Sequence, residues 1–286
     1  MNASYILTLS CNDRPGLVAV VSGLIAQSGG NILDAHQFDD ALSGRFFMRI
    51  RFALNGRDDA ASHFRAKFAA LAAEHDMTWK LRAETDLPKV ILMVSKSDHC
   101  YFDLLYRYRT GELKMDVVAI ISNHPQSVHR MSLAGDIPYH HLPIENHDKP
   151  AQEAKIKAIV TDTGADLVIL ARYMQILSDD LARFLEGRCI NIHHSFLPSF
   201  KGAQPYHQAH ARGVKMIGAS SHYVTADLDE GPIIAQDVEH ISHADTPSDL
   251  IRKGRDIERR VLARAVGWHI QDRVLMNGMK TVVFRD

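Results

Sequence analysis

The segment NIHHSFLPSFKG, which begins at Asn191, places an asparagine and two histidines directly behind an apolar run. Asn191 and His193 are two residues apart, so on a continuing strand they point to the same side while Ile192 points into the core. Amide donors and imidazoles are groups that stabilise a tetrahedral oxyanion. A satisfied strand-end asparagine followed by a surface histidine is the alternative interpretation. The prolines and glycine that follow predict a loop, which ends at a helix beginning near Pro205.

A second group of reactive side chains lies in HYVTADLDEGPII, which begins at His222. A strand ends there, the acids Asp227, Asp229 and Glu230 follow, and Gly231 starts the turn into the next apolar strand. Three acids in one turn are usually solvated, but the flanking strands hold this loop in place. His222, seven residues upstream of Asp229, can reach a carboxylate. Asp229, beside the tight turn, is therefore the best candidate for a general base.

The elements that must position these residues alternate between strands and helices. The apolar runs VILMVS, MDVVAIISN, ADLVILA and CINIHHS read as strands, and helices are expected at about 101–110, 152–163 and 179–185. Near-continuous apolar strands between helices predict a mostly parallel α/β sheet of Rossmann-like type, covered on both faces. Ligands of such sheets bind beyond the carboxyl ends of the strands, which is where the NIHH segment lies.

The N-terminal part has a different order of elements. Strands are expected at 5–10, 31–40, 45–54 and 77–84, and helices at about 17–28 and 58–74. The order βαββαβ is that of a ferredoxin-like unit. In the turn NDRPG, Asn12 or Asp13 is expected to cap the first helix. A proline in TDLPK interrupts the strand pattern, so we expect domains at 1–85 and 86–286.

With its DRPG turn and the GGN that enters the second strand, this N-terminal segment resembles an ACT domain, a small regulatory module. The resemblance implies pairing through the sheets, giving a homo-oligomer (dimer or tetramer), and an amino-acid effector near the turn. The effector-binding residues would be Asn12, Asp13, Gly30 and Asn31, and the effector glycine or methionine, which report on one-carbon supply. The alternative is that these residues only form turns and caps.

Residues 89–286 resemble the formyltransferase fold of folate-dependent one-carbon enzymes. NIHHSFLPSFKG followed by HYVTADLDEGPII carries the resemblance. It implies that Asn191, His193 and Asp229 are catalytic and that His222 supports them.

The segment ARYMQILS, which begins at Ala171, resembles the segment of that family that borders the pterin. The resemblance implies folate-binding roles for Gln175, Ile176 and Leu177. Ordinary helix packing is the alternative for the two apolar residues.

Departures from the family patterns indicate which branch the chain resembles. VSKSDHC has no glycine with which to cradle a substrate phosphate. Because the sequence ends at VVFRD, we also do not expect the additional basic C-terminal domain of a tRNA enzyme. His194 stands where the ribonucleotide transferases have proline. These features resemble the deformylase branch, which implies hydrolysis of 10-formyltetrahydrofolate to formate and tetrahydrofolate in one-carbon and purine metabolism. The alternative is formyl transfer to a small acceptor such as glycinamide ribonucleotide.

Composition excludes several other classes. The chain has 286 residues, with 33 Lys and Arg against 34 Asp and Glu, so no basic field favours nucleic acid. The three cysteines form no paired motif, which favours a reducing, cytoplasmic setting without a zinc ribbon or a disulfide framework. The N-terminal residues MNASYILTLSCNDRPG carry no basic stretch and only a short apolar run, so we expect neither export nor a membrane span there. We expect neither a metal nor a tightly bound cofactor.

Two other classes remain open. A metal-dependent hydrolase could combine several residues that ligate metals, but adjacent histidines on one strand point to opposite faces and no HExxH pair appears. Those residues are His140, His141, His193, His194, His222 and Asp229. The other class is an amino-acid sensor without enzymatic activity, and the intact Asn191, His193 and Asp229 set argues against it.

Overall fold

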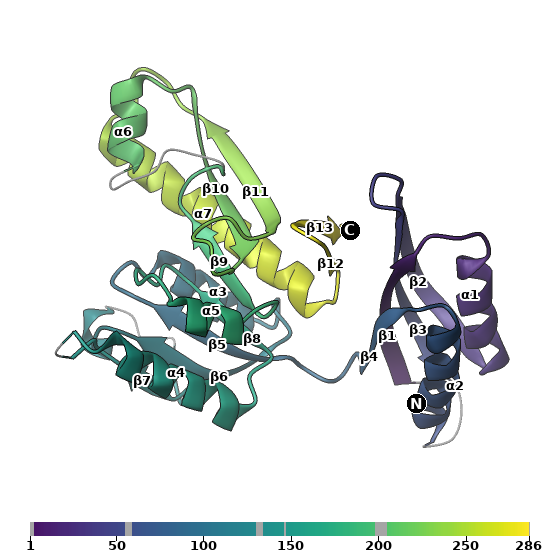
Figure 1. The fold of residues 1–286 in the computed structure, drawn as a ribbon. Coiled ribbons are helices and arrows are strands. Elements are labelled where there is room, and N and C mark those ends of the chain that lie inside the picture. Colours follow the sequence, from purple (N-terminus) through teal and green to yellow (C-terminus); the bar gives the residue numbers. More distant parts are fainter. Residues whose placement is uncertain (1–2, 55–58, 130–133, 146, 198–204, 286) are drawn as a thin grey trace. The chain divides into compact units, whose positions relative to one another are not determined.

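Figure 1 draws the computed structural model of the chain, which describes residues 3–54, 59–129, 134–145, 147–197 and 205–285. The chain divides into two compact units, one of residues 1–87, 271–277 and 281–286 and the other of residues 88–270 and 278–280. The expected division after residue 85 lies near the first change of unit. The expectation that everything after it forms one domain differs at the C-terminus, where the chain returns to the first unit.

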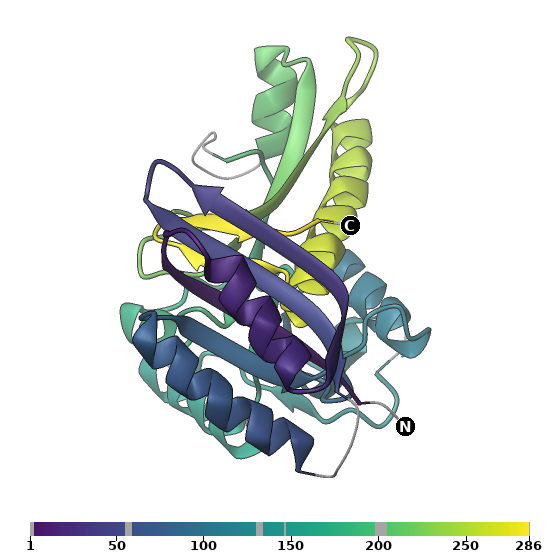
Figure 2. The same ribbon diagram turned by 90° about the vertical axis from the view of Figure 1, so that its right-hand side faces the viewer.

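The first unit contains an antiparallel four-stranded sheet in the order β2-β3-β1-β4. Its elements are β1 (Ala3–Asn12), α1 (Leu17–Gln27), β2 (Gly30–Asp40), β3 (Arg45–Leu54), α2 (Ala60–Glu74) and β4 (Thr78–Ala83). The predicted βαββαβ order is therefore confirmed. Figure 2 looks onto α1 and α2, which both lie on the near face of this sheet.

Alternating side chains decide what covers each face of that sheet. Ile50 and Phe52 of β3 point to the helices and join the buried cluster that includes Phe64 of α2. Arg49 points to the other face, where its Nε donates to the backbone carbonyl of Gln271 at 3.1 Å. Residues 271–277 and 281–286, which carry β12 (Val274–Asn277) and most of β13 (Lys280–Val283), thus belong to the first unit.

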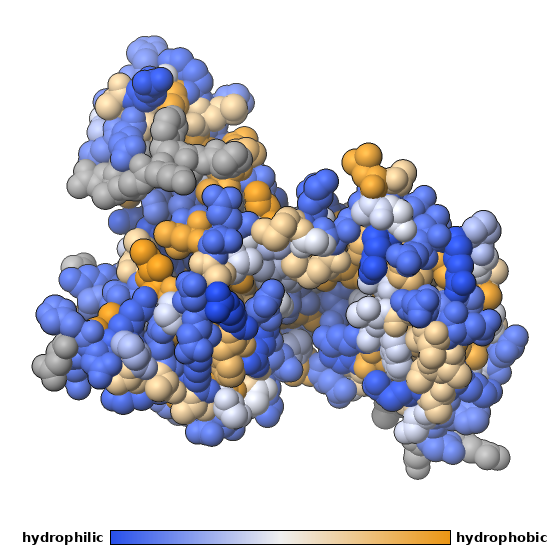
Figure 3. All heavy atoms as spheres, in the orientation of Figure 1, coloured by the Kyte–Doolittle hydropathy of each residue, from blue (hydrophilic) through white to orange (hydrophobic). Residues whose placement is uncertain are grey.

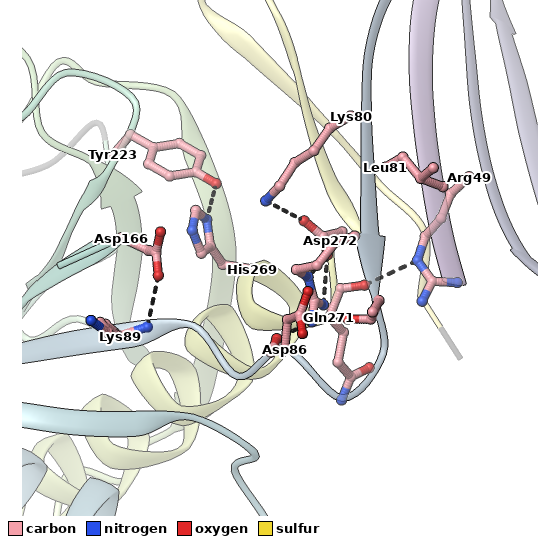
Figure 4. A network of polar contacts seen from close by, with 12 residues as sticks. Arg49, Lys80, Leu81, Asp86, Lys89, Asp166, Tyr223, His269, Gln271 and Asp272 are labelled. Atoms are coloured by element: carbon pink, nitrogen blue, oxygen red, sulfur yellow. Dashed lines mark hydrogen bonds and ion pairs between the residues drawn. The ribbon is translucent and has the colours of Figure 1, made fainter. Parts of the chain in front are cut away.

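An aspartate fastens this C-terminal segment. Asp272 accepts from Lys80 Nζ at 2.8 Å (Figure 4). It also accepts from Arg82 Nε at 2.8 Å. Burial alone would raise the pKa of the Asp272 carboxyl, but the two cations outweigh it and the pKa is lowered. The ion pairs of Asp272 thus hold the C-terminal segment to β4 of the first unit. No local sequence pattern predicts this contact.

The expected cap of α1 is wrong. Gly16 occupies the N-cap position with a φ of 94°, and no side chain caps the helix. Strand β1 continues to Asn12, and the backbone N–H of Asp13 donates to the carbonyl of Gly44 at 2.9 Å. Asn12 and Asp13 therefore lie too early in the chain to reach the helix, and glycine supplies the left-handed turn.

The second unit contains a seven-stranded sheet in the order β11-β10-β9-β8-β5-β6-β7. Its elements are β5 (Lys89–Val94), α3 (His99–Arg109), β6 (Asp116–Ser122), the 3-10 turn η1 (Gln126–Val128), β7 (Tyr139–His141), α4 (Lys149–Thr163), β8 (Leu167–Leu170), α5 (Asp179–Phe184), β9 (Cys189–His193), α6 (Pro205–Arg212), β10 (Met216–Tyr223), β11 (Ile233–His240) and α7 (Pro247–Ile270). The five strands β9, β8, β5, β6 and β7 pair in parallel. Strands β10 and β11 extend the sheet beyond β9 by antiparallel pairing. The predicted mostly parallel sheet is confirmed.

Helices cover both faces of this sheet. Residues of α4 and α5 pack with Ile91 and Met93 of β5 in one buried cluster, and α3 and α7 pack against β5, β9 and β10 on the other face. Successive strands are added on opposite sides of the β5–β8 pair, with β6 and β7 beyond β5 and β9 beyond β8. The loops that follow β5 and β8 therefore border the crevice where such sheets bind ligands. The backbone N–H of Met174 donates to Ser95 Oγ at 2.9 Å and joins these two loops.

In the described part of the chain, no helix is both long and apolar enough to span a lipid bilayer. Cys11, Cys100 and Cys189 are free thiols, and all three are buried. Residues 198–204 of the loop expected after Leu197 lie outside the described residues, and α6 begins at Pro205 as predicted.

Candidate active site

The two strand residues singled out by spacing share one face of β9 with a histidine of the next strand. Strand β9 ends at His193, so Asn191 and His193 point to the same side and Ile192, 3% exposed, points into the core. In the antiparallel pairing with β10, His222 stands directly opposite Asn191. The Asn191 Nδ2 atom lies 3.2 Å from His222 Nε2. The register therefore brings together residues thirty-one positions apart.

The acidic loop delivers one carboxylate to these side chains. Asp229 Oδ2 lies 3.3 Å from His193 Nδ1, and its Oδ1 lies 3.6 Å from His222 Nε2. Asp227 and Glu230 are exposed. Hydrogen bonds with His193 and then with His222 outweigh burial and hold the pKa of the Asp229 carboxyl well below its ordinary value. Asp229 is therefore an ionised acceptor at neutral pH.

The backbone of this loop explains why the carboxylate points inward. Asp229 has a φ of 59°, a left-handed conformation that aspartate tolerates better than most residues. A Cβ at Gly231 would overlap the carbonyl oxygen of Tyr223, so only glycine can pass so close to the end of β10. The sequence DEG thus fixes the return of the loop onto the strand.

Hydrogen bonds determine the orientation of the His222 ring. Its Nδ1 lies 2.9 Å from the backbone carbonyl of Tyr223, which can only accept, so Nδ1 carries a proton. In the neutral ring Nε2 then accepts from the Asn191 amide, and in the cation it donates to Asp229. Tyr223 is held in turn by a 2.6 Å hydrogen bond between its hydroxyl and His269 Nδ1 of α7 (Figure 4).

His194 does not follow the strand pattern. Adjacent strand residues were expected on opposite faces, but the His193 and His194 rings are stacked, with centroids 5.0 Å apart and an interplanar angle of 19°. The expectation is wrong for this pair because β9 ends at His193 and the chain bends there. Burial, then Arg172 and then His193, lower the pKa of His194 to about 4.

The expected pterin segment lies in the irregular stretch between β8 and α5, beside the same crevice. Ile176 is 62% exposed and is not packed in a helix, whereas Leu177 packs against the core. Ser178 caps α5, and both its N–H and its hydroxyl donate to the buried carboxylate of Glu153. Gln175 is half-buried. An exposed apolar side chain on a fixed segment suits contact with a flat ring.

The expected effector residues surround the turn between β1 and α1 and the start of β2. Asn12, Asp13 and Asn31 are exposed. At Gly30 a Cβ would lie 2.7 Å from Ile25 Cγ2 and 2.9 Å from the Ile25 carbonyl oxygen, so this position needs glycine for packing. Among the described residues, no hydrogen bond joins the side chains of these positions to another group.

The structure separates the histidines of the metal hypothesis. His140 and His141 lie on β7 at one edge of the sheet, and β6, β5 and β8 stand between that edge and β9. Within the described ranges, the group with ligand atoms close enough for a metal is His99, Cys100 and Glu258, whose atoms lie within 4.8 Å of one another. Arg172 already faces that carboxylate, with Nε 3.4 Å from Glu258 Oε2.

Sequence reasoning missed Arg172, Tyr206 and Glu258, which lie behind the stacked histidines. One signal was available: Glu258 interrupts the apolar stripe of α7, between Ile257 and Val261. A carboxylate at such a position must be buried with partners. The sequence does not reveal which partners these are, because they come from three other elements.

Comparison with known proteins agrees with this geometry. The formyl transferase family profile matches residues 88–266 and the ACT domain profile matches residues 5–66. The formyltetrahydrofolate deformylase of Corynebacterium sp. is 48% identical over 98% of this chain and 98% of its own. That of Synechocystis sp. is 47% identical over 99% of each chain.

Solved structures show the same relationship. The crystal structure of formyltetrahydrofolate deformylase from Burkholderia mallei has a TM-score of 0.92 at 49% identity, covering 99% of this chain and 100% of that one. Glycinamide ribonucleotide transformylase 1 from Symbiobacterium toebii has a TM-score of 0.65 at 28% identity, covering 72% of this chain and 98% of that one. The resemblance inferred from the motifs is confirmed, and the chain belongs to the formyltetrahydrofolate deformylase family.

Proposed function

We propose that the protein hydrolyses 10-formyltetrahydrofolate to formate and tetrahydrofolate. The observation that carries the proposal is the convergence of two donors and one ionised carboxylate, Asn191, His193 and Asp229, at the carboxyl end of β9. The nearly full-length similarity to formyltetrahydrofolate deformylases supports it.

In the first step, Asp229 takes a proton from water as the water oxygen bonds to the formyl carbon. The carbonyl π electrons move to the formyl oxygen, which becomes an oxyanion. The second N–H of the Asn191 amide, not used by His222, donates to this oxygen, and protonated His193 adds a charged donor. Ionised Asp229, 3.3 Å from His193 Nδ1, favours that protonated form.

In the second step, the oxyanion reforms the carbonyl and the bond between carbon and N10 breaks. The proton held by Asp229 passes to N10, so tetrahydrofolate leaves neutral at that nitrogen. The carboxylic acid formed loses its proton to solvent as formate. His222 keeps Asp229 and Asn191 in place, and no tightly bound cofactor is required.

The pterin of the substrate lies against Gln175, Ile176 and Leu177 in this proposal. Exposure of Ile176 beside the crevice supports the placement. His194 supports His193 through the ring stack.

An amino-acid effector, glycine or methionine, binds near Asn12, Asp13, Gly30 and Asn31. The ACT domain match supports this part of the proposal.

Pairing through the sheet of the ACT-like unit gives a homo-oligomer, a dimer or a tetramer. Strand β2 is the edge of that sheet and exposes Ile32, Leu33 and Phe38. In Figure 3 the turn between β2 and β3 carries an apolar tip, where Leu42 is 91% exposed. Three free buried thiols suit a reducing cytoplasm.

The decisive experiment mixes purified protein with 10-formyltetrahydrofolate alone and measures formate and tetrahydrofolate release, with and without glycinamide ribonucleotide. Release without an acceptor is expected. Turnover only with the ribonucleotide would make the chain a transferase and would overturn the proposal.

A further inference from the structure

A buried carboxylate lies behind the proposed catalytic histidines, where it makes two hydrogen bonds and one ion pair with groups from three other parts of the chain. Glu258 of α7 is 1% exposed. His99 Nε2 of α3 lies 2.8 Å from its Oε2, and the Tyr206 hydroxyl of α6 donates to its Oε1 at 2.7 Å. Arg172, which follows β8, brings Nε to 3.4 Å from Oε2. Burial alone would raise the Glu258 pKa, but these partners lower it, so the group is an anion that balances a buried cation.

Two backbone features maintain these contacts: a left-handed conformation at Arg172 and a glycine at position 254. Arg172 has a φ of 65°, which an ordinary side chain adopts only where the surroundings impose it. On α7, a Cβ at Gly254 would overlap the Tyr206 ring, so this glycine leaves the room in which the Tyr206 hydroxyl reaches Glu258 one turn further on.

Arg172 connects this carboxylate to the stacked histidines. Its NH1 lies 2.8 Å from His194 Nδ1. A guanidinium can only donate, so His194 Nδ1 must be an unprotonated acceptor and the ring hydrogen must be on Nε2. The His194 ring in turn stacks on His193.

Two protonated imidazoles stacked at this distance would repel each other, so the site favours one cation for the pair. Five groups face His194: Arg172 after β8, His193 of β9, Tyr206 of α6, Asp229 of the acidic loop and Glu258 of α7. Arg172 is the one that occupies Nδ1, and Asp229 contacts His193. The two rings therefore differ in their nearest charge: a cation contacts His194 and an anion contacts His193.

We propose that Arg172 and Glu258 are positioning residues that hold His194 as the neutral Nε2–H tautomer and thereby reserve the imidazolium of the site for His193. Glu258 serves as the counterion that lets Arg172 stay buried and aimed at His194. This inference rests on the proposed function for its catalytic meaning, but the tautomer is a property of the resting protein. Without Arg172, His194 can accept a proton, and the two stacked rings then compete for the one imidazolium of the site.

The test compares Arg172→Gln with the native chain by nitrogen-15 NMR of histidine-labelled protein, with His194→Gln used to identify the His194 signals. In the native chain we expect neutral Nε2–H shifts and a titration midpoint near 4. In Arg172→Gln the midpoint rises toward the ordinary value of about 6.5, incompletely because burial is the largest cause. Unchanged shifts and titration in that variant, or an Nδ1–H tautomer in the native chain, would overturn the proposal.

The kinetic readout is the pH dependence of kcat/KM for formate release. In both Arg172→Gln and Glu258→Gln the basic limb, where the imidazolium of the site is lost, should move to lower pH by about one unit, equivalent to a roughly tenfold loss on the basic side. Arg188→Gln is the matched control. Arg188 precedes β9, at the end of the strand opposite to His193, and donates to the backbone carbonyls of Ala165 and Phe184. A purely structural network would lower activity equally at all pH values and would contradict the proposal.

The two readouts separate this inference from the proposed function. If the native protein releases no formate but His194 shows the Nε2–H tautomer and responds to Arg172→Gln, the proposed function fails and the positioning role stands. Formate release with an unresponsive His194 gives the opposite result.

Discussion

The strand-end site of the second unit and the DRPG turn of the first were both predicted from short motifs, yet the structure organises them differently. At the strand end, Asn191, His193, His222 and Asp229 contact one another at 3.2 to 3.6 Å. At the turn, Asn12, Asp13 and Asn31 are exposed and, across the described ranges, none of these three side chains donates to or accepts from another group, whereas Arg14 donates to the backbone carbonyl of Glu74 at 3.2 Å.

The difference teaches what each region can do alone. Donors fixed before the substrate arrives need little reorganisation, which is the property that makes an oxyanion site effective. An open turn must be ordered by whatever binds there, so the ligand provides the missing partners and affinity is lower. We therefore expect catalysis to be sensitive to single atoms in the second unit and regulation to be a modest effect of the first.

The largest effect is expected for Asp229→Asn. Asparagine also tolerates the left-handed backbone, so the loop stays in place while the general base is lost. Formate release should fall by about 10²–10⁴, the range for a general base, with little change in the unfolding temperature. Activity within tenfold of the native protein would show that water is activated by another group.

The second-largest effect is expected for Asn191→Ala. Its kcat should fall by about 10²–10³ while its KM stays within a few-fold of the native value, because the donor acts on the oxyanion and not on the ground-state substrate. Asn277→Ala is the matched control: this asparagine of the first unit donates to Asp40 at 2.7 Å, and its loss should leave kcat unchanged. A rise in KM with kcat preserved would assign Asn191 to substrate binding.

Asp272→Asn should show the reverse pattern, a loss of stability without a loss of chemistry. The Asp272 side chain is 11% exposed and ion-paired with Arg82 at 2.7 Å, so its loss should lower the unfolding free energy of the first unit by about 1–3 kcal/mol at pH 7. Its pKa is depressed by the cations, so this stability is present above the unfolded value of about 3.9 and is lost as the pH falls through the lower folded value.

Denaturant titrations followed by Trp79 fluorescence would measure the effect, with Trp268→Phe as the background so that one tryptophan reports. Native and variant proteins should converge below about pH 4. A constant difference down to pH 2, or a tenfold fall in kcat, would contradict the assignment of Asp272 to stability.

The same contrast explains what could be predicted from sequence. Asn191, His193 and His222 lie where strand periodicity and an antiparallel neighbour require, and Asp229 was selectable because the glycine turn is local. His194 was misplaced because nothing local marks the end of β9. Arg172 and Glu258 meet through packing of α7 against distant loops, and Asp272 through the return of the chain to the first sheet. These contacts depend on tertiary geometry, which no spacing in the sequence encodes.

The smallest effect is expected at the turn. In calorimetry, glycine or methionine should bind the native protein and change the rate of formate release. Asn31→Ala should weaken that binding by about five- to tenfold, which corresponds to one hydrogen bond of about 1 kcal/mol, while the rate without effector stays unchanged. Asn31 is exposed, so the substitution should not disturb the fold. Ser43→Ala is the matched control, because it removes a hydrogen bond to Asp40 in the β2–β3 turn of the same unit. Absence of heat and of any rate change with both amino acids would remove the effector from the proposal and leave the first unit with its role in pairing alone.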